Sequence, residues 1–508
     1  MFTEEGIPVS GDGAVLLLTP AGHRTVKYHQ PPRNRGNFKF ESGEHAAIGD
    51  SITLRFSTND PGTPASDVAL NLLNRLALTY GQIVALGGDF YGDPGRPIAD
   101  GSSPEDRIAR FTNDFNTLAM LPASKDEATQ ILAVMQTEID AVNAAIAEGR
   151  DPHVAYEALG DSLSDRWAMI IGKRYLALAV SNWDHFGEWA VLAYKAGHAA
   201  ALRQAIAAHA GGGRGALELA YAMNAFADHF LSDLFSAGHM RTPRKQLADH
   251  ISALGLGSYV SSFLSRVMHD EDSKFGLNVT NGHHEIWRAY GDKRFFDTID
   301  LTNRNHVKQA VQASADEIFD AFIRGGAPAP EDYVALNRIV NLSQVSDPSN
   351  RANYSPLFVA ADNTVLRRTN VNDLNDRTWT KDWWGVTTMC ELVGHKPNNP
   401  TGYLSPPNVP PIIQDDGWQS HTPVSPHWVD GNAVRYAFSY ANVLNESYTG
   451  PWSHYVDLSG SYFPTLTVPV DRTGAASTRR IFRQFRDGAP MLVGTIGDTT
   501  TTFIDNTP

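Results

Sequence analysis

The residues that most clearly suggest a chemical role lie near position 230. The segment ADHFLSDLFSAGHMRTPR holds His229, Asp233 and His239 in a His-x3-Asp-x5-His pattern. Residues four apart share one face of a helix, so His229 and Asp233 can ligate the same metal ion. We expect Gly238 to end that helix and His239 to turn toward a second ion. An exposed helix with a polar solvent face would show the same spacing, so the pattern needs support elsewhere.

Four further positions supply such support. His45 stands where a helix is expected to begin, and Asp89 follows an apolar helix and a Gly pair, where a carboxylate can point back into a bundle. His185 stands at the head of another helix, and His269 is followed directly by the acids of 270–272. Each of these residues alone is more often a structural or surface group. Together they form an ordered series of imidazole and carboxylate groups, which suits zinc.

The composition agrees with ligation by nitrogen and oxygen. The chain of 508 residues has 18 histidines but one cysteine, Cys390, which excludes an internal disulfide and thiolate zinc modules. The net charge of -14 disfavours attraction of nucleic acid or anionic lipid to the whole surface. Hydrophobic residues make up 42% of the chain and charged residues 19%, so we do not expect a mainly disordered protein.

Helical periodicity dominates between about residues 66 and 346. Apolar residues recur at i, i+3, i+4 and i+7, as in an amphipathic helix, and glycines follow several of the stretches. We therefore expect a helical bundle whose segments position the histidines and aspartates. The stretches with this pattern are 67–88, 126–149, 163–183, 185–213, 216–238, 245–269 and 305–326.

The pattern changes after residue 356. A Pro-rich stretch at 397–417 indicates a linker, and the short alternating runs beyond it are typical of a β-sandwich and resemble a fibronectin type III module. The predicted fold class is multidomain, a mainly α-helical bundle followed by an all-β sandwich. The predicted divisions are a metal-dependent catalytic domain in 1–355 with an insertion at about 95–165, an extension and linker in 356–417, and the sandwich in 418–508.

The sequence contains no stretch near the ~20 apolar residues of a membrane span. Its N-terminus begins acidic, and the apolar run at 14–18 is shorter than the core of a secretion signal. We expect an extracellular protein without a recognisable signal in this chain, and a cytoplasmic protein is the alternative.

The ordered histidines and aspartates resemble the bacterial zinc-dependent phospholipase C family. The resemblance implies a helical bundle with three clustered zinc ions, an architecture that zinc-dependent single-strand nucleases share. It covers residues 40–300, approximately, and is strongest at GGDFYGDP (87–94) and at the histidine–aspartate segment of 229–239. The segments MHDED (268–272) and WRAYGD (287–292) are similar to those of the larger, phosphatidylcholine-hydrolysing branch.

The resemblance also implies roles for single residues. His185, His229 and Asp233 would hold one zinc ion, with Asp233 bridging to a second ion that His45 ligates. Asp89 would touch metal or water and act as the general base.

The third ion would be held by His239, His269 and an acid, for which we choose Asp272. The family has a glutamate four residues after the last histidine, whereas Ser273 stands here, so Glu271 and Asp292 are alternatives to Asp272.

Two more departures affect the first half of the chain. Compact family members use their N-terminal amine as a ligand, but Met1 precedes His45 by more than forty residues, and Glu44 is a possible substitute. The interval from Asp89 to His185 is also long, which an inserted helical region explains.

Three residues are candidates for binding substrate. Phe90 and Tyr91 could face a choline ammonium by cation–π contact, and Arg241 could steer a phosphate, although packing and a solvated basic turn explain them equally simply. The expected function is a phospholipase C that cleaves phosphatidylcholine to diacylglycerol and a phosphorylated head group at a membrane or micelle surface, without nucleic acid or an obligate protein partner. The alternatives are a single-strand nuclease of the same architecture and a non-catalytic surface-binding protein.

Overall fold

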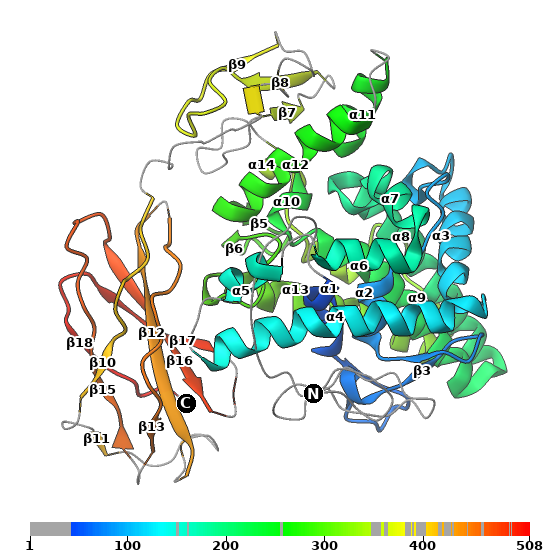
Figure 1. Cartoon of the computed structure of the whole chain (residues 1–508). Helices are drawn as coiled ribbons and strands as arrows, with labels where there is room; N and C mark the ends of the chain where they lie inside the picture. Colours follow the sequence, from blue (N-terminus) through cyan, green and yellow to red (C-terminus); the bar gives the residue numbers. More distant parts are fainter. Residues whose placement is uncertain are drawn as a thin grey trace.

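A computed structural model shows a helical region followed by a strand-rich region, which confirms that part of the predicted fold class (Figure 1). None of the described helices is long and apolar enough to cross a membrane. The apolar run at 14–18 lies outside the described residues. The structure describes residues 42–148, 152–159, 162–253, 258–346, 357–359, 364–381, 388, 391–392, 403–414, 419–420, 428, 431–443, 445–458, 462–486, 488 and 490–507.

The helices pack around a central pair, α8 and α9, with α2, α3 and α13 against them. A turn at 208–212, in which Gly211 has a φ of 122°, reverses the chain between α8 and α9. Every residue of α9 from Ala220 to its end is buried, so this helix lies at the centre of the domain. The helices are α1 (Ser42–Asp50), α2 (Tyr80–Leu86), α3 (Pro104–Ala119), α4 (Ala123–Ala147), α5 (Pro152–Leu159), α6 (Ser162–Ile171), α7 (Lys173–Val180), α8 (Gly187–Ala207), α9 (Gly213–Asp233), α10 (Ala237–Met240), α11 (Arg244–Ala253), α12 (Ser258–Phe275), α13 (Leu301–Arg324) and α14 (Leu342–Val345).

Small residues let the central helices approach closely. A Cβ atom on Gly197 of α8 would lie 2.4 Å from the Phe111 ring of α3 and 2.6 Å from the Cβ of Ala227 in α9. Protein interiors have little free volume, so a larger residue at 197 would separate three helices at once.

The helix predicted over 67–88 is wrong in its first half. Residues 70–78 form a short hairpin, with Leu70 paired to Leu78, and only Tyr80–Leu86 is helical. Arg75 takes a φ of 65° at the turn, and the Asn74 side chain donates to Leu118 O and accepts from Leu76 N. An Asn followed by a left-handed residue is a turn signal that the apolar repeat concealed. Thr79 and Gln82 then form a capping box that starts α2.

The helix predicted over 216–238 also ends earlier in the structure than expected. The helix α9 stops at Asp233, and Gly238 lies inside the separate one-turn helix α10 together with His239. Because α9 already ends at Asp233, His239 approaches the site from a different direction than His229 does.

The C-terminal β region, which we define as β10 to β18, has a four-stranded sheet in the order β13-β12-β16-β17 and a three-stranded sheet in the order β10-β15-β18. Both sheets contribute to one apolar core that includes Phe438, Leu466 and Ile481. The fibronectin type III-like sandwich and the three domain boundaries stay predictions, and β10, which pairs with β15, lies before the proposed boundary at 418. The strands are β1 (Thr53–Leu54), β2 (Thr63–Pro64), β3 (Leu70–Asn71), β4 (Ala77–Leu78), β5 (Leu277–Thr280), β6 (Ile286–Ala289), β7 (Leu357–Val359), β8 (Val365–Arg368), β9 (Trp379–Thr380), β10 (Ile412–Ile413), β11 (Gln419–Ser420), β12 (Ala433–Ala441), β13 (Val456–Asp457), β14 (Tyr462–Phe463), β15 (Thr465–Thr467), β16 (Thr478–Phe485), β17 (Met491–Gly497) and β18 (Thr502–Ile504).

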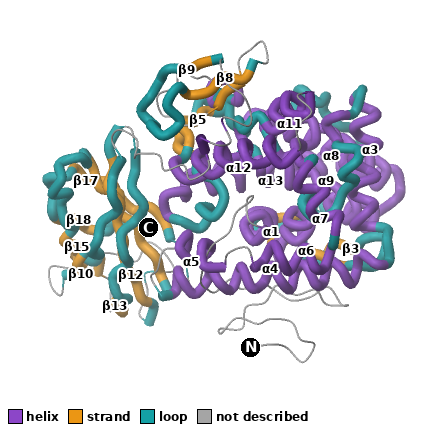
Figure 2. The backbone as a smooth tube through the Cα atoms, turned by 45° about the horizontal axis from the view of Figure 1, so that its top comes forward, coloured by secondary structure: helices purple, strands orange, loops and turns teal. Residues whose placement is uncertain are grey.

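The C-terminal β region lies beside the end of the long helix α4 (Figures 1 and 2). Arg435 of β12 donates to Ala147 O at that end over 3.1 Å. A second contact joins the hydroxyls of Thr449 and Thr298 over 2.9 Å. The two regions of the chain therefore meet at two separate places.

Candidate metal centre

The structure brings three groups of histidine and aspartate side chains together, each able to hold a metal ion. The ligand atoms within a group lie within 4.8 Å of one another, and every residue in the three groups is buried. The groups are His45, His229 and Asp233, then Asp89, His185 and His229, and then His239, His269 and Asp292.

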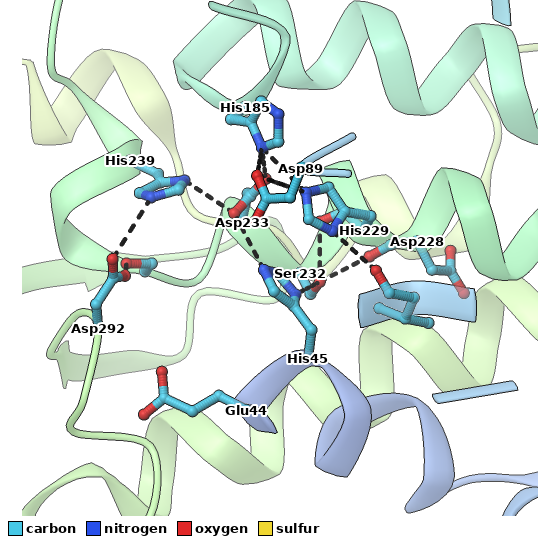
Figure 3. Close-up of polar contacts among 12 residues, drawn as sticks. Glu44, His45, Asp89, His185, Asp228, His229, Ser232, Asp233, His239 and Asp292 are labelled. Carbon is cyan, nitrogen blue, oxygen red and sulfur yellow. Dashed lines mark hydrogen bonds and ion pairs between the residues drawn. The ribbon is translucent and has the colours of Figure 1, made fainter. Parts of the chain in front are cut away.

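Asp233 lies at the middle of these groups (Figure 3). One of its carboxylate oxygens is 2.8 Å from His239 Nδ1 and 3.6 Å from His45 Nε2. The other oxygen is 2.8 Å from His185 Nδ1 and 3.6 Å from His229 Nε2. A carboxylate with histidines at both oxygens has the arrangement of a ligand that bridges two ions.

Backbone and hydroxyl acceptors fix which ring nitrogen faces the centre. His229 Nδ1 lies 2.8 Å from Val84 O, which can only accept, so Nδ1 carries the proton and Nε2 offers its lone pair to the centre. Ser232 Oγ donates to Asp228 O, so its lone pairs face His45 Nδ1 at 2.9 Å. The Nε2 atoms of both histidines are thereby prepared to bind a cation.

Asp89 reaches the centre because two glycines precede it. A Cβ atom on Gly88, whose φ is 63°, would lie 2.8 Å from the rings of both His185 and His229. Asp89 Oδ1 is 3.8 Å from His185 Nδ1 and 3.9 Å from His229 Nε2. Tetrahedral zinc with ligands at 2.0–2.2 Å requires donor separations of about 3.4 Å, so this spacing needs a change of only about 0.5 Å.

The third group lies on the side of the His239 ring that faces away from Asp233. His269 Nε2 is 3.0 Å from Asp292 Oδ2, and His239 Nε2 is 3.9 Å from the same oxygen. Ser236 Oγ donates to the other oxygen, Asp292 Oδ1, over 2.6 Å. The His239 ring stacks on Phe186, with 4.7 Å between ring centroids, which holds it between Asp233 and Asp292.

We correct the choice of Asp272 as the acid of this group. Both its carboxylate oxygens accept from Arg241, over 2.7 and 2.8 Å, in a buried bidentate ion pair. Arg241 therefore pairs with Asp272, and its guanidinium is not directed at a phosphate site as predicted.

Packing explains why the acid comes from a different element. A Cβ atom on Gly291 would lie 2.1 Å from Ser273 Oγ, so the small side chain at 273 fits beneath the backbone of the following loop. Gly291 N donates to Ser273 O over 3.2 Å. That loop then supplies Asp292, whose Oδ2 lies 3.0 Å from His269 Nε2.

Of the remaining proposed residues, Tyr91 lines a pocket beside His185, whereas Phe90 and Glu44 lie away from the ligand groups. Phe90 is buried and packs edge-on to Trp167, with 5.2 Å between ring centroids. The hydroxyl of Tyr91 donates to Ser124 O over 3.2 Å. Glu44, the proposed substitute for an amine ligand, accepts from the backbone N–H groups of Lys293 and Phe295, and Figure 3 shows it apart from the cluster.

A small pocket opens beside His185. Its lining includes Gly88, Phe230 and three aspartates but contains no lysine or arginine. Burial raises the pKa of Asp114 to about 8 and that of Asp184 to about 7, so only part of this lining is charged at neutral pH. The aspartates are Asp93, Asp114 and Asp184.

The electrostatics of the cluster favour cations. Burial and the neighbouring His229 lower the pKa of His45 to about 3, so this ring is neutral near pH 7. Burial opposes the charge on Asp233, but His239, His229 and His185 hold the pKa of Asp233 well below its usual range. Burial likewise opposes a charge on His269, yet Asp292 raises its pKa to about 10. A metal ion would displace that proton.

Several polar atoms of the cluster are buried and, although they form ion pairs with one another, make no well-aligned hydrogen bond with described residues of the chain. Such atoms cost free energy unless something binds them, so the residues fit a set of zinc ions. They are Asp233 Oδ1, both ring nitrogens of His239, His269 Nε2 and Asp292 Oδ2.

Sequence reasoning missed two residues that orient ligands, Ser232 and Ser236. Both stand inside the segment HFLSDLFSAGH, next to the proposed ligands, so their position along the chain was a usable signal. Whether a serine forms a hydrogen bond with a ligand depends on side-chain direction, which that segment alone does not specify.

The chain matches no protein-family model. It is 41% identical over 87 residues to alpha-latrotoxin-Lhe1a of Latrodectus hesperus, a match that covers 16% of this chain and 6% of the toxin. It is 37% identical over 119 residues to delta-latroinsectotoxin-Lt1a of Latrodectus tredecimguttatus, which covers 23% of this chain and 9% of that toxin. The chain thus matches less than a tenth of the length of these curated relatives.

Among solved structures, the alpha toxin from Clostridium absonum aligns over 80% of this chain and 99% of its own, with 10% identity and a TM-score of 0.12. A TM-score of that size carries no argument about fold or function. The conclusion about the centre therefore rests on its own geometry, which is that of a cluster of three potential metal sites joined through Asp233, His229 and His239.

Proposed function

We propose that this protein is a zinc-dependent phosphodiester hydrolase of the phospholipase C type. In this reaction water adds to the phosphorus of a glycerophospholipid, and the bond from phosphorus to the glycerol oxygen breaks. The glycerol oxygen takes up a proton, which gives diacylglycerol and a phosphorylated head group. Phosphatidylcholine is the substrate that the resemblance to the phospholipase C family favours.

The observation that carries the proposal is the sharing of ligands between adjacent groups. His229 belongs to two of the groups, and His239 contacts both Asp233 and Asp292. Zinc ions bound in this arrangement would neutralise phosphoryl oxygens, lower the pKa of water and stabilise the departing alkoxide. A single structural metal needs four ligands and no such continuity.

Asp89 is the residue we assign as general base. It follows Gly88, which lines the pocket, and its side chain is 4% exposed, so it lies at the border between the ligands and the space for substrate. A carboxylate there can orient a water molecule and accept its proton. His185 lines the same pocket, so this opening leads directly to the centre.

The lining of the pocket favours a lipid over a nucleic acid. Proteins that bind single strands combine basic grooves with stacking aromatic residues, and no lysine or arginine is among the described residues that line this pocket. At neutral pH the partly ionised aspartates carry negative and no positive charge, so the lining is more compatible with a head group that carries a cationic ammonium than with a polyanion.

The test combines metal analysis with two substrates. The full chain, purified with zinc, should release phosphorylated head group from phosphatidylcholine micelles, lose this activity on chelation and regain it with added zinc. Cleavage of single-stranded DNA alone would establish the nuclease alternative. Full activity in metal-free protein would overturn the proposal, and absence of any hydrolysis by zinc-loaded protein would favour a surface-binding role.

A further inference from the structure

Two residues of the C-terminal β region contact the helical region next to the third metal group. Tyr448 and Thr449 lie on the segment that follows β12. That segment runs alongside β12, with Ser447 N donating to Tyr440 O over 2.8 Å and Gly450 N donating to Phe438 O over 2.9 Å. Tyr448 and Thr449 are therefore presented from a hydrogen-bonded edge of the sheet and not from a free loop.

Tyr448 joins the two elements that carry His269 and Asp292. Its hydroxyl donates to Lys274 O over 2.7 Å, at the end of α12, the helix on which His269 lies. Its ring lies under the guanidinium of Arg294, 4.0 Å from ring centroid to Cζ, and Arg294 is two residues after Asp292. A cation over an aromatic face contributes more when desolvated, and Arg294 is 3% exposed.

Thr449 holds the far end of the same loop. Thr298 Oγ1 donates to Thr449 Oγ1 over 2.9 Å. Arg294 also forms an ion pair with Asp297 over 3.0 Å, so the contacts of Tyr448 and Thr449 are linked within the loop. On the opposite side, Glu44 of α1 accepts from the N–H groups of Lys293 and Phe295.

These contacts matter because the third group lacks the helical spacing that would set its geometry. The distance of 3.0 Å between His269 Nε2 and Asp292 Oδ2 is set by how the loop of 291–298 sits against α12. Ser236 fixes the rotation of the Asp292 carboxylate, and Gly291 N ties the start of the loop to Ser273 O. Beyond Asp292 the loop is held by Glu44 from one side and by Tyr448 and Thr449 from the other.

The geometry points to Tyr448 and Thr449 as positioning residues through which the C-terminal β region sets the zinc affinity of the third group. Residues that orient metal ligands from outside the ligand set change metal affinity by about 10–100-fold when replaced. The inference rests on the proposed function in that it takes the third group to hold zinc. It gives the C-terminal β region a role in the centre itself, in place of a spacer or a lipid-docking module.

The experiment measures zinc binding in the full chain. Zinc per protein and the Kd of the weakest ion, from competition with a chromophoric chelator, are compared between the native chain and two variants. Tyr448→Ala removes the contacts of this side chain with Lys274, Arg294 and Tyr290. Tyr448→Phe combined with Thr449→Val keeps the packing and deletes both hydrogen bonds. The control is Tyr455→Ala, which removes a tyrosine that lies under Arg435 and Arg486 in the same β region, away from the loop of 291–298.

We expect three ions in the native chain and in the control. In Tyr448→Ala the weakest ion should bind at least about tenfold less tightly. The isosteric double variant should show a smaller change in the same direction, with an unchanged circular dichroism spectrum, and it decides the question if Tyr448→Ala fails to fold. Activity should fall with the occupancy of this ion and return at high zinc.

Native zinc affinity for all three ions in both variants would overturn the inference while leaving the proposed function intact. An equal loss of affinity in Tyr455→Ala would also overturn it, because the effect would then be general loosening of the C-terminal β region. Absence of zinc from the native chain would instead overturn the proposed function.

Discussion

The two ends of the metal centre are built in different ways. At one end His229 and Asp233 stand four residues apart on α9, a helix that is buried along its second half. At the other end His269 lies on α12, whereas Asp292 comes from a loop whose position depends on contacts with α1 and with the C-terminal β region. The first end is set by the helix repeat, and the second is set by tertiary contacts.

This difference determines how each end should respond to change. A ligand pair on one buried helix moves only if the helix moves, because the helix backbone fixes both Cβ directions. A helix and a loop can shift relative to each other without unfolding, so a remote contact can alter ligand geometry there. The following predictions test this contrast.

The largest effect is expected from Asp233→Asn at the helical end. Its two carboxylate oxygens contact four histidines, so loss of the negative charge should abolish binding at more than one group. Loss of one Lewis acid costs several kcal/mol of transition-state stabilisation. At 1.36 kcal/mol per tenfold in rate, hydrolysis should fall by about 10³-fold or more. Asp249→Asn, at an exposed residue of α11, is the control and should retain full zinc content and activity.

Substitutions of the two candidate acids at the loop end, Asp292 and Asp272, should have different effects. Asp292→Asn should weaken one zinc ion by at least about 100-fold, because it removes a ligand and not an orienting group. Asp272→Asn should leave the zinc content at its native value but destabilise the fold by about 3–5 kcal/mol, since it leaves Arg241 buried without its partner. Zinc analysis and urea unfolding of both variants measure these outcomes, and loss of zinc in Asp272→Asn alone would restore Asp272 as the ligand.

The aspartates of the pocket beside the helical end should make the stability of the fold depend on pH. Burial raises the pKa of Asp114 from 3.8 to about 8, so the folded state prefers the neutral form. Its contribution to stability is complete below about pH 4 and disappears as the pH rises through about 8. A single proton accounts for at most about 1.4 kcal/mol per pH unit.

Asp114→Asn keeps an acceptor for Asp93 N and removes this titration. The variant should therefore lose less thermal stability than the native chain between about pH 5 and pH 8. Melting followed by circular dichroism at the two pH values is the measurement. Identical losses in the two proteins would show that Asp114 is ionised in the folded state throughout.

The smallest effect is expected from Thr79→Ala. Thr79 Oγ1 accepts from Gln82 N and caps α2, the helix whose Val84 O orients His229. Removing such a cap costs about 1 kcal/mol. Denaturant unfolding should show that loss, while zinc affinity should stay within about twofold, since α2 remains packed against α9. A large loss of zinc would mean that the helical end, like the loop end, depends on contacts outside the ligand set.

The sequence allowed the helical end to be predicted and the loop end only in part. The apolar repeat predicts a helix over 216–238, which holds His229 and Asp233 on one face, and the structure has a helix over Gly213–Asp233. Asp292 appeared among the candidate acids but could not be preferred over Asp272. The two acids differ in whether a buried arginine is within reach, and Arg241 lies 31 residues from Asp272 in sequence.

Within single segments, one sequence pattern also concealed another. The apolar repeat over 67–88 continues smoothly through a hairpin, and the turn at Asn74 and Arg75 outweighs it. Phe90 follows Asp89 directly, yet it points into a cluster with Trp167 and Tyr175. Asp89 and Phe90 lie in a turn and their side chains make different contacts, so proximity in sequence to a ligand does not place a side chain in the site.

The sequence by itself determined the ligand types and one ligand pair. Eighteen histidines and a single cysteine restrict a metal site to imidazole and carboxylate, and a spacing of four residues on a helix sets one pair. Only the tertiary structure decided that Asp292 completes the third group, that Arg241 neutralises Asp272, and that Tyr448 contacts the loop beside the centre. The physical reason is that these contacts join segments far apart along the chain, and their side-chain directions follow from packing and not from spacing.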